Sequence, residues 1–397
     1  MNLISIDELD VKEKRVFIRV DFNVPIVNGQ IVDDTKIFAA LPTIEYAFKE
    51  KARVIIASHL GRPGGKLKPK LTLEPVGRRL SEILKREIFF PEDCVGDVVK
   101  KIAGDLAPGG IMLLENLRFH KGEEENDPRF ARRLAQVADV YVNEAFSVSH
   151  RSHASVTGIL DFVETACVGL GFKNEVENLT RLIENPERPF VAVFGGRSAG
   201  EKIPIMESLL DNVDAILIGG ALSNTFLKAL GKETGKSVID EIALYSASKF
   251  ISSASARGIR VVLPQDFIVI KGDLNSYSAP LTTHAGVFSR DGIAVDIGPK
   301  TRDDFALRLS RAKTIFWNGP LGIYENEDFR GGTKAVAGAV GASGAFSVAL
   351  GWDTVLAIKR AGFSGAITHL STGGRAGLEF VGKRRLPALE ALEKRSK

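Results

Sequence analysis

Residues 172–202 read FKNEVENLTRLIENPERPFVAVFGGRSAGEK, and this segment separates two halves of the chain that have similar patterns. Its first part has apolar residues at helical spacing, and Asn174 followed by Glu177 predicts a capping box at the start of that helix. Two prolines, Pro186 and Pro189, then end the helix. The next five residues are apolar and predict a buried strand. The segment therefore predicts a helix that joins two domains.

A glycine-rich loop follows this strand and ends at Lys202. Glycines let backbone N–H groups approach an anion, the start of the next helix is positive, and a lysine adds charge. This order predicts a phosphate-binding loop. An ordinary strand-to-helix turn explains such a loop equally well, so the loop alone does not decide the function.

The whole chain has the composition of a globular protein with roughly two domains. It has 397 residues, of which 44% are hydrophobic and 26% charged, and its net charge is only +4. No apolar run approaches the roughly 18 residues of a membrane span, and the first residues do not resemble a secretory signal. We therefore expect a cytoplasmic protein that binds neither a membrane nor nucleic acid. Cys94 and Cys167 are the two cysteines, and their spacing predicts neither a disulfide framework nor a zinc site.

In the first half, four apolar runs alternate with longer polar or helical segments, at 15–20, 53–57, 110–114 and 140–142. This alternation predicts a parallel sheet with helices on both faces, in which ligands bind at the carboxyl ends of the strands. Polar and basic residues follow each run: Asp21, Asn23 and Lys36; His59 and Arg62; Arg118 and His120; His150, Arg151 and His153. Any one of them is more often a solvated surface group. Together they predict a crevice for a small molecule with several negative charges.

The pattern restarts in the second half, with runs at 190–194, 215–218, 260–263, 314–317 and 345–349. Glycines follow most of these runs, which predicts a site where a ligand lies against the backbone, and Asp353 with Thr354 at a helix start could hold magnesium or a phosphate oxygen. No G-x-G-x-x-G follows the first strand and no Walker A motif occurs. Glycines as turn residues remain the alternative. An anion crevice and a nucleotide-like crevice suggest phosphoryl transfer between two bound substrates.

Four motifs resemble the phosphoglycerate kinase family along essentially the whole chain. They read RVDFNVP at 19–25, SHLGRP at 58–63, LENLRFHKGEE at 114–124 and FWNGP at 316–320. The resemblance implies an α/β fold of two doubly wound parallel-sheet domains joined by a helix. It predicts a phosphoglycerate-binding domain at 1–172, a linking helix at 173–189, a nucleotide-binding domain at 190–378 and a tail at 379–397 that returns to the first domain.

The resemblance also implies the reaction, which is reversible phosphoryl transfer between 1,3-bisphosphoglycerate and ADP to give 3-phosphoglycerate and ATP. Magnesium accompanies the nucleotide, the two domains close like a hinge, and a monomer is expected. The phosphoglycerate site would consist of Asp21, Asn23, Lys36, His59, Arg62, Arg118 and Arg151. The nucleotide site would consist of Gly195, Gly196, Lys202, Asn318, Glu325, Gly351, Trp352, Asp353 and Thr354, with Asp353 near the metal. The expected catalytic cations are Lys36, Lys202, Arg197 and Arg375.

This chain departs from the family pattern in the loops expected to handle the phosphoryl group. Lys36 stands where the family has an arginine, and Ser198 stands where it has a lysine. Trp352 and Arg375 stand at family glycines, and Ser147-Val148-Ser149-His150 stands where the family has Gly-Thr-Ala-His. Two hypotheses follow: a working phosphoglycerate kinase with reduced activity, or a homologue that keeps the anion crevice only as a binding module. A periplasmic-type binding protein is a third alternative, but it requires a signal peptide.

Overall fold

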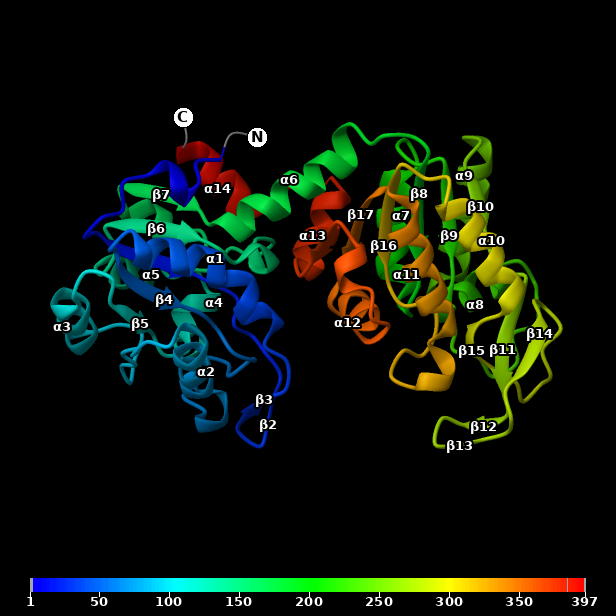
Figure 1. Ribbon diagram of the computed structural model, residues 1–397, viewed down its shortest axis with the longest axis horizontal. Coiled ribbons are helices and arrows are strands. Elements are labelled where there is room, and N and C mark those ends of the chain that lie inside the picture. Colours follow the sequence, from blue (N-terminus) through cyan, green and yellow to red (C-terminus); the bar gives the residue numbers. More distant parts are fainter. Residues whose placement is uncertain (1–2, 384, 396–397) are drawn as a thin grey trace. The chain divides into compact units, whose positions relative to one another are not determined.

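The structure is a computed structural model, and it describes residues 3–383 and 385–395. By its contacts the chain divides into two compact units (Figure 1): unit 1 comprises Met1–Glu177 and Arg385–Lys397, and unit 2 comprises Asn178–Arg384. The division falls within helix α6, Leu170–Glu184. Residues 1–2, 384 and 396–397, which the predicted domain ranges include, lie outside the described residues.

Unit 1 contains a five-stranded parallel sheet in the order β5-β4-β1-β6-β7. Its strands are β1 (Arg15–Arg19), β4 (Arg53–Ala57), β5 (Ile111–Leu113), β6 (Val140–Asn143) and β7 (Thr165–Val168). The four predicted runs form the first four of these strands. Strand β7 was not predicted. A two-residue hairpin, β2 (Ile26–Val27) with β3 (Gln30–Ile31), lies outside this sheet.

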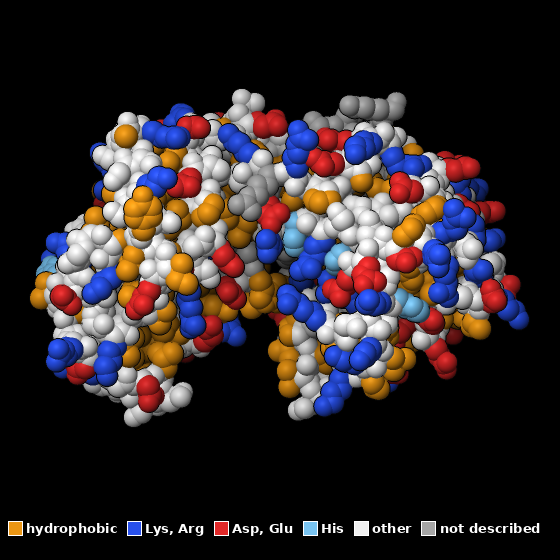
Figure 2. All heavy atoms as spheres, turned by 180° about the vertical axis from the view of Figure 1, so that it is seen from behind, with side chains coloured by type: hydrophobic (Ala, Val, Ile, Leu, Met, Phe, Trp, Pro, Cys, Tyr) orange, Lys and Arg blue, Asp and Glu red, His pale blue; other side chains and the backbone are white. Residues whose placement is uncertain are grey.

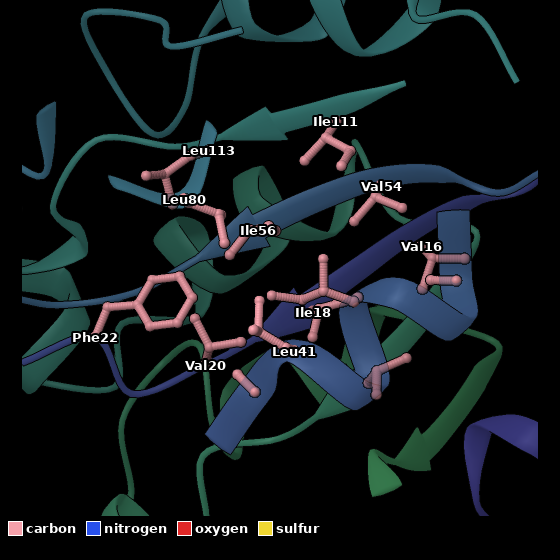
Figure 3. Close-up of a cluster of buried hydrophobic side chains, with 14 of the residues drawn as sticks. Val16, Ile18, Val20, Phe22, Leu41, Val54, Ile56, Leu80, Ile111 and Leu113 are labelled. Atoms are coloured by element: carbon pink, nitrogen blue, oxygen red, sulfur yellow. The ribbon is translucent and has the colours of Figure 1, made fainter. Parts of the chain in front are cut away.

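Both faces of this sheet are buried, which explains why most residues of its strands are apolar. Val16 and Ile18 pack with Leu41 of α1 and Leu80 of α2 in one hydrophobic cluster, and Figure 3 shows these side chains converging between strands and helices. Phe17 points to the opposite face, because consecutive strand residues alternate, and it is also fully buried. The helices of unit 1 are α1 (Thr35–Lys49), α2 (Glu74–Leu84), α3 (Asp97–Asp105), α4 (Lys121–Glu124), α5 (Pro128–Ala135) and α14 (Pro387–Arg395), with short 3₁₀ helices η1 (Ile6–Glu8), η2 (Pro69–Leu71), η3 (Leu117–Phe119), η4 (Phe146–Val148) and η5 (Gly158–Phe162).

Helix α14 packs within unit 1 although it comes last in the sequence. The N–H of Ala388 donates to the carbonyl oxygen of Ser149 at 3.1 Å, and Ala388 is part of a small apolar cluster with Val148. The guanidinium of Arg395 donates to the carbonyl oxygens of Leu160 and Val163. The last helix therefore covers the loops that follow β6.

Unit 2 contains a six-stranded parallel sheet in the order β10-β9-β8-β16-β17-β18. Its strands are β8 (Phe190–Phe194), β9 (Ala215–Ile218), β10 (Arg260–Val262), β16 (Thr314–Asn318), β17 (Phe346–Leu350) and β18 (His369–Ser371). The five predicted runs match all but β18. An antiparallel sheet, which was not predicted, adds β11 (Asp266–Ile270), β14 (Leu281–His284) and β15 (Ile293–Ile297), and β12 (Gly272–Asp273) pairs with β13 (Ser276–Tyr277).

Both faces of the larger sheet of unit 2 are also buried. Val193 and Trp317 pack with Phe305 of α10 and Val336 of α11 on one face, and Phe194 meets Phe316 edge-on at 5.6 Å between ring centres on the other. The helices of unit 2 are α7 (Ala199–Leu209), α8 (Gly220–Ala229), α9 (Leu244–Ala256), α10 (Pro299–Leu309), α11 (Gly331–Ser343), α12 (Trp352–Arg360) and α13 (Gly374–Val381), with η6 (Glu241–Ala243), η7 (Glu327–Phe329) and η8 (Ser364–Ala366). The predicted α/β class with parallel sheets is confirmed.

The predicted capping box at the start of α6 is wrong. The helix begins at Leu170, so Asn174 lies inside it. The carboxylate of Glu144, at the end of β6, accepts the N–H groups of Gly171 and Phe172 instead, at 3.0 and 3.3 Å. A side chain distant in the sequence thus takes the capping role that local sequence had suggested for Asn174.

Charged side chains of both signs are interspersed over the face of the molecule drawn in Figure 2. This mixture agrees with the small net charge of +4. Among the described residues, no helix is both long enough and apolar enough to cross a membrane.

Candidate functional site

The predicted anion-binding residues of unit 1 follow the carboxyl ends of its parallel strands. Asp21 and Asn23 come after β1, His59 comes after β4, Arg118 lies in η3 after β5, and Arg151 follows η4 after β6. Because the strands are parallel, these ends lie along one edge of the sheet. The topology therefore brings the loops that carry these residues together.

Asp21 is the centre of a compact hydrogen-bonded group. Its Oδ2 accepts from the ammonium of Lys36, in the first turn of α1, at 2.8 Å and from the hydroxyl of Ser147. Its Oδ1 accepts the N–H of Asn23 at 3.0 Å. Burial would raise the pKa of Asp21, but the charge of Lys36 and the hydrogen bonds from Lys36 and Ser147 hold it below its usual range. Asp21 is therefore ionised.

His59 is buried and neutral. Its Nδ1 lies 3.2 Å from Nη2 of Arg19, and since a guanidinium only donates, Nδ1 accepts and the ring proton is on Nε2. The Nε2 lies 4.0 Å from Oδ1 of Asp21. Burial lowers the pKa of His59 well below its usual value, and the nearby cations Arg19 and Arg118 add to this effect against the opposing charge of Asp21. The ring can donate a hydrogen bond but contributes no positive charge.

Arg118 brings a buried positive charge to the same group of loops. Its Nη1 donates to the carbonyl oxygen of Gly61 at 2.8 Å, and its Nε lies 3.3 Å from the carboxylate of Glu124. Burial, together with the charges of Arg19 and Arg151, lowers the pKa of Arg118 to about 10, while the charge of Glu124 opposes this effect. The side chain remains charged near pH 7, so it can bind an anion.

The two other predicted arginines are less tightly held. Arg151 is half-buried, and its Nε donates to Nε2 of His150 at 3.2 Å. Arg62 is exposed and makes no ion pair with any residue that the structure describes. Hydrogen bonds or charge interactions thus link a group of five residues: Asp21, Lys36, His59, Arg118 and Arg151. The exposed Arg62 is not part of this group.

A buried polar network beneath this group was missed from the sequence. Arg19 and Glu123 are both fully buried, and the hydroxyl of Ser155 joins them, accepting from Nε of Arg19 at 2.7 Å and donating to Glu123 at 2.6 Å. The N–H of Ser155 also donates to Glu123 at 2.9 Å. Arg19 of this network contacts the ring of His59 and so orients it. The network also links α4, which contains Glu123, to the segment after η4, which contains Ser155. An arginine ending an otherwise apolar strand was the signal that could have revealed it, because an unpaired buried charge is costly.

Unit 2 contains a cavity of about 690 Å³ at the carboxyl ends of its central strands. The N-terminal residues of three helices, α7, α8 and α12, contribute to its wall through Ser198, Gly220 and Trp352. Helix N-termini present unpaired N–H groups and a partial positive charge, so they favour an anion such as a phosphate. Apolar residues, among them Phe267 and Val295, also line the cavity. The cavity has the size of a small-molecule site, and its lining is partly polar and partly apolar.

Lys202, in the first turn of α7, reaches the glycine-rich end of this cavity. Its ammonium donates to the carbonyl oxygens of Gly195 and, at 3.3 Å, Asn318. Burial lowers the pKa of Lys202 to about 8, against the opposing charges of Asp353 and Glu201. A group with this pKa is poised to gain a proton when an anion binds beside it.

Gly195 and Gly196, at the start of the predicted phosphate loop, are each required for a different physical reason. A Cβ on Gly195 would lie 2.2 Å from the carbonyl oxygen of Pro320, so this glycine is needed where two backbone segments approach each other. Gly196 has a φ of +73°, which favours glycine, and it lines the cavity. Of the two, Gly196 is the one whose backbone faces the cavity.

Asn318 and Thr354 hold the loops around the cavity. The amide nitrogen of Asn318 donates to the carbonyl oxygen of Leu350 at 2.7 Å, whereas its buried Oδ1 has no partner among the described residues. The hydroxyl of Thr354 donates to the same carbonyl at 2.9 Å and accepts the N–H of Gly319 at 2.8 Å. The Thr354 proton is thus already used, while the Asn318 oxygen is available to a ligand.

Asp353 and Glu325 are exposed carboxylates on the cavity wall. The hydroxyl of Tyr324 donates to Oδ1 of Asp353 at 3.4 Å, which leaves Oδ2 for a ligand. Magnesium prefers hard oxygen ligands, usually one or two carboxylates with phosphate oxygens, so Asp353 fits a magnesium–nucleotide complex. Gly351 precedes it with a φ of +102°, and the half-buried Trp352 lines the same wall.

Two of the expected catalytic cations, Arg197 and Arg375, differ in whether they line the cavity. Arg197 is exposed and lines the cavity beside Ser198. Arg375 does not line the cavity, and its Nε donates to Oε1 of Glu379 at 2.8 Å on the exposed side of α13. The structure therefore brings Lys202 and Arg197, but not Arg375, to the cavity wall.

A possible metal cluster elsewhere in unit 1 consists of Asp93, Cys94 and His120, whose ligand atoms all lie within 4.8 Å of one another. Nε2 of His120 lies 2.6 Å from Oδ1 of Asp93. Burial raises the pKa of the Cys94 thiol well above its usual range. A protonated thiol is a poor metal ligand, and the carboxylate and imidazole already satisfy each other.

Comparisons with known proteins cover nearly the whole chain. The family model described as phosphoglycerate kinase matches residues 6–383. Proteins named phosphoglycerate kinase from Anaeromyxobacter sp. (strain K) and Moorella thermoacetica are 47% and 46% identical to this chain, covering 99% of it and 100% and 99% of their own length. The structure of phosphoglycerate kinase from Coxiella burnetii matches with a TM-score of 0.88 at 38% identity over 100% of both chains. That from Pyrococcus horikoshii OT3 also has a TM-score of 0.88, at 29% identity over 99% of both chains.

Proposed function

The chain belongs to the phosphoglycerate kinase family and is a glycolytic kinase of that kind, and from this premise we propose how its residues carry out the reaction. The reaction is reversible phosphoryl transfer between 1,3-bisphosphoglycerate and ADP, which gives 3-phosphoglycerate and ATP. Unit 1 binds the phosphoglycerate, and unit 2 binds the nucleotide.

The phosphoglycerate ligand has a phosphate, a carboxylate and one hydroxyl, and unit 1 offers a partner for each. The cations Lys36, Arg118 and Arg151, together with the exposed Arg62, bind the two anionic groups. Asp21 is the ionised carboxylate among these cations, and it is a natural acceptor for the hydroxyl. Asn23 orders the loop, since its Oδ1 accepts the N–H of Gly61 at 2.9 Å.

The cavity of unit 2 is the observation that carries the proposal. Its three helix N-termini and Lys202 suit the phosphates of ATP, and its apolar lining residues suit the base. Gly196 and Gly351 let the backbone lie close to the phosphates, and Glu325 is available to the ribose hydroxyls. When bound, magnesium at Asp353 would neutralise charge on the nucleotide phosphates.

No general base is required. The acceptor in the ATP-consuming direction is a carboxylate that is already ionised near pH 7, and His59 is neutral and buried. The chain's own task is to position the two substrates and to neutralise charge on the phosphoryl group during transfer. We assign this role to Lys36, Lys202 and Arg197, with Arg375 available if α13 moves.

Transfer requires the two ligands to meet, so the proposal includes closure of the units around the joining helix α6, which would also exclude water as a competing acceptor. We further propose a monomer that works in the cytoplasm, where ATP is available. Each unit carries a separate ligand site of its own, which supports function without a second copy of the chain.

A coupled assay for ATP-dependent consumption of 3-phosphoglycerate tests the function. We expect activity, and we expect Asp353→Asn to lower kcat/KM for magnesium-ATP at least about tenfold, since one charge-assisted contact contributes about 1.5 to 3 kcal/mol. Asp303→Asn, on the exposed side of α10, is the matched control and should have no effect. Binding of 3-phosphoglycerate without any turnover would instead support the non-catalytic alternative, which the names of the relatives do not favour.

A further inference from the structure

The hydrogen bonds to Asp21 are unevenly divided between its two carboxylate oxygens. Oδ2 accepts both from the ammonium of Lys36 at 2.8 Å and from the hydroxyl of Ser147. Among the described residues, Oδ1 accepts only from the backbone N–H of Asn23, at 3.0 Å, and it faces Nε2 of His59 at 4.0 Å. A carboxylate oxygen can accept about two hydrogen bonds, so Oδ2 is filled and Oδ1 keeps a free acceptor position.

We propose that Ser147 is a positioning residue for phosphoglycerate, which acts with Lys36 to orient the Asp21 carboxylate so that Oδ1 accepts the ligand's hydroxyl. This inference rests on the proposed function of unit 1. It assigns a role to Ser147, a residue that the sequence motifs had marked only as a departure from the family pattern.

The chemistry of Lys36 explains why a second donor is needed. An arginine, which the family pattern has at this position, grips both oxygens of a carboxylate in one plane with its fork of N–H groups. A lysine is a point charge that does not fix the rotation of the carboxylate, and the terminal torsion of aspartate is intrinsically broad. The hydroxyl of Ser147, arriving at the same oxygen from η4, restricts that rotation.

Lys36 and Ser147 come from distant segments and meet at one atom. The two are 111 positions apart in the chain, by 147 − 36. Both donate to Oδ2 of Asp21. The contact therefore joins the first turn of α1 to η4 through a single carboxylate oxygen.

The location of the pair supports a role in binding rather than in folding alone. The side chains of Lys36 and Asp21 are 18% and 12% exposed, so they are accessible to a small ligand. Ser147 is half-buried and lies between the strand β6 and Arg151, which is one of the expected ligand contacts. The titratable groups that act on Asp21 are Lys36 and His59, and His59 in turn lies near Arg19 and Arg118.

The first experiment removes the hydroxyl. Ser147→Ala should raise the KM and the dissociation constant for 3-phosphoglycerate about tenfold and leave the KM for ATP unchanged, while Ser147→Thr, which keeps a hydroxyl, should retain most of the affinity. Ser149→Ala is the matched control, because the buried Ser149 hydroxyl lies two residues away and has no hydrogen-bond partner in the part of the chain that the structure describes. Thermal unfolding of each variant checks that it is folded. Equal effects of Ser147→Ala on both KM values, or no effect on either, would contradict the inference.

The second experiment is a double-mutant cycle with calorimetry of 3-phosphoglycerate binding and turnover as readouts. Ser147→Gly should weaken binding about tenfold beside Lys36 but have less than about twofold effect in the Lys36→Arg background, where the fork holds Asp21 by itself. The same loss in both backgrounds would overturn the coupling, while the function proposed for the enzyme would stand. If the unchanged protein neither binds nor phosphorylates 3-phosphoglycerate, both the inference and the proposed function are wrong.

Discussion

The ammonium of Lys202 donates to the carbonyl oxygens of Gly195 and Asn318, and it is partly desolvated by the loops around it. Burial lowers its pKa to about 8, and the neighbouring Asp353 only partly offsets this effect. Carbonyl dipoles stabilise a cation less than a bound phosphate does, so the charge state of this lysine should depend on the ligand.

We predict that nucleotide binding takes up protons at mildly alkaline pH. A bound phosphate favours the charged amine and raises its pKa, so near pH 8 to 9 a partly deprotonated Lys202 gains up to one proton, whereas near pH 6.5 it is already protonated and gains none. Calorimetry of ADP binding in buffers of different ionisation enthalpy measures this uptake. Lys202→Met should abolish it, and Lys228→Met, at an exposed position of α8, should not. Uptake that persists in Lys202→Met would assign the proton to another group.

The sequence predicted those site residues whose position follows directly from a strand end. Asp21, His59 and Asn318 are of this kind, because the carboxyl ends of parallel strands meet at one edge. It did not predict the partners of Arg19 or Ser147, because the partner of each comes from a distant segment. Nor does a residue type fix the direction of a long side chain, as the pairing of Arg375 with Glu379 illustrates.

At the scale of elements, the start of α6 depends on Glu144. The oxygens of its carboxyl group accept the N–H groups of Gly171 and Phe172, and the hydroxyl of Thr43 accepts the N–H of Leu170 at 2.8 Å. Burial raises the pKa of Glu144 to about 8, although the hydrogen bonds from Phe172, Thr43 and Gly171 lower it. The cap of the helix that joins the two units is therefore a largely protonated acid near pH 7.

We predict that this acid makes the protein less stable as the pH rises. Because the pKa of Glu144 is higher in the folded than in the unfolded state, the folded state binds more protons between about pH 4.5 and 8, and stability falls across that window. Glu144→Gln, which mimics the neutral acid, should remove this slope and be more stable than the unchanged protein at pH 8.5 by roughly 2 to 4 kcal/mol. Urea unfolding at several pH values measures the difference.

Two further variants separate the effect of the Glu144 charge from the effect of its hydrogen bonds to the start of α6. Glu144→Ala should be less stable than Glu144→Gln at every pH by about 1 kcal/mol, because it leaves helix N–H groups without an acceptor. Glu177→Gln, at an exposed position of α6, should leave the pH dependence unchanged. A slope that survives in Glu144→Gln would mean that other groups control the alkaline limit of stability.

Apolar runs marked most strands of the two parallel sheets, but not every strand. The run 190–194 became β8, whereas β18, His369–Ser371, has a polar residue at each end and lies in no apolar run. Strand β14 of the antiparallel sheet, Leu281–His284, is largely exposed and polar, so no apolar run marked it. The capping box at Asn174 failed because Glu144, a residue from another segment, satisfied the helix start.

For the whole molecule, the proposed mechanism has the two substrates bound to different units. Lys36 acts from unit 1, and Ser198, which stands where the family has a lysine, lines the nucleotide cavity of unit 2. A residue of unit 2 can affect phosphoglycerate chemistry only in the complex where both ligands are bound and the units have closed. Its effect should therefore appear in turnover and not in the binding of phosphoglycerate alone.

Substitutions of Ser198 test whether a residue of unit 2 affects turnover without affecting the binding of phosphoglycerate. A serine hydroxyl cannot offset charge that develops on the transferring phosphoryl group, and loss of one such stabilising group typically costs about 3 to 4 kcal/mol, or two to three decades in rate. Arg197, which lines the same wall, recovers part of that loss, so we expect slow but measurable turnover. Ser198→Lys should raise kcat by roughly ten- to a hundredfold and leave the dissociation constant of 3-phosphoglycerate unchanged. Ser198→Met is the control, because methionine is about as long as lysine but carries no charge. It should not raise kcat. If Ser198→Met accelerates the reaction as much, or if the unchanged protein already turns over at roughly hundreds per second, then charge at position 198 does not limit the reaction and Arg197 already supplies it.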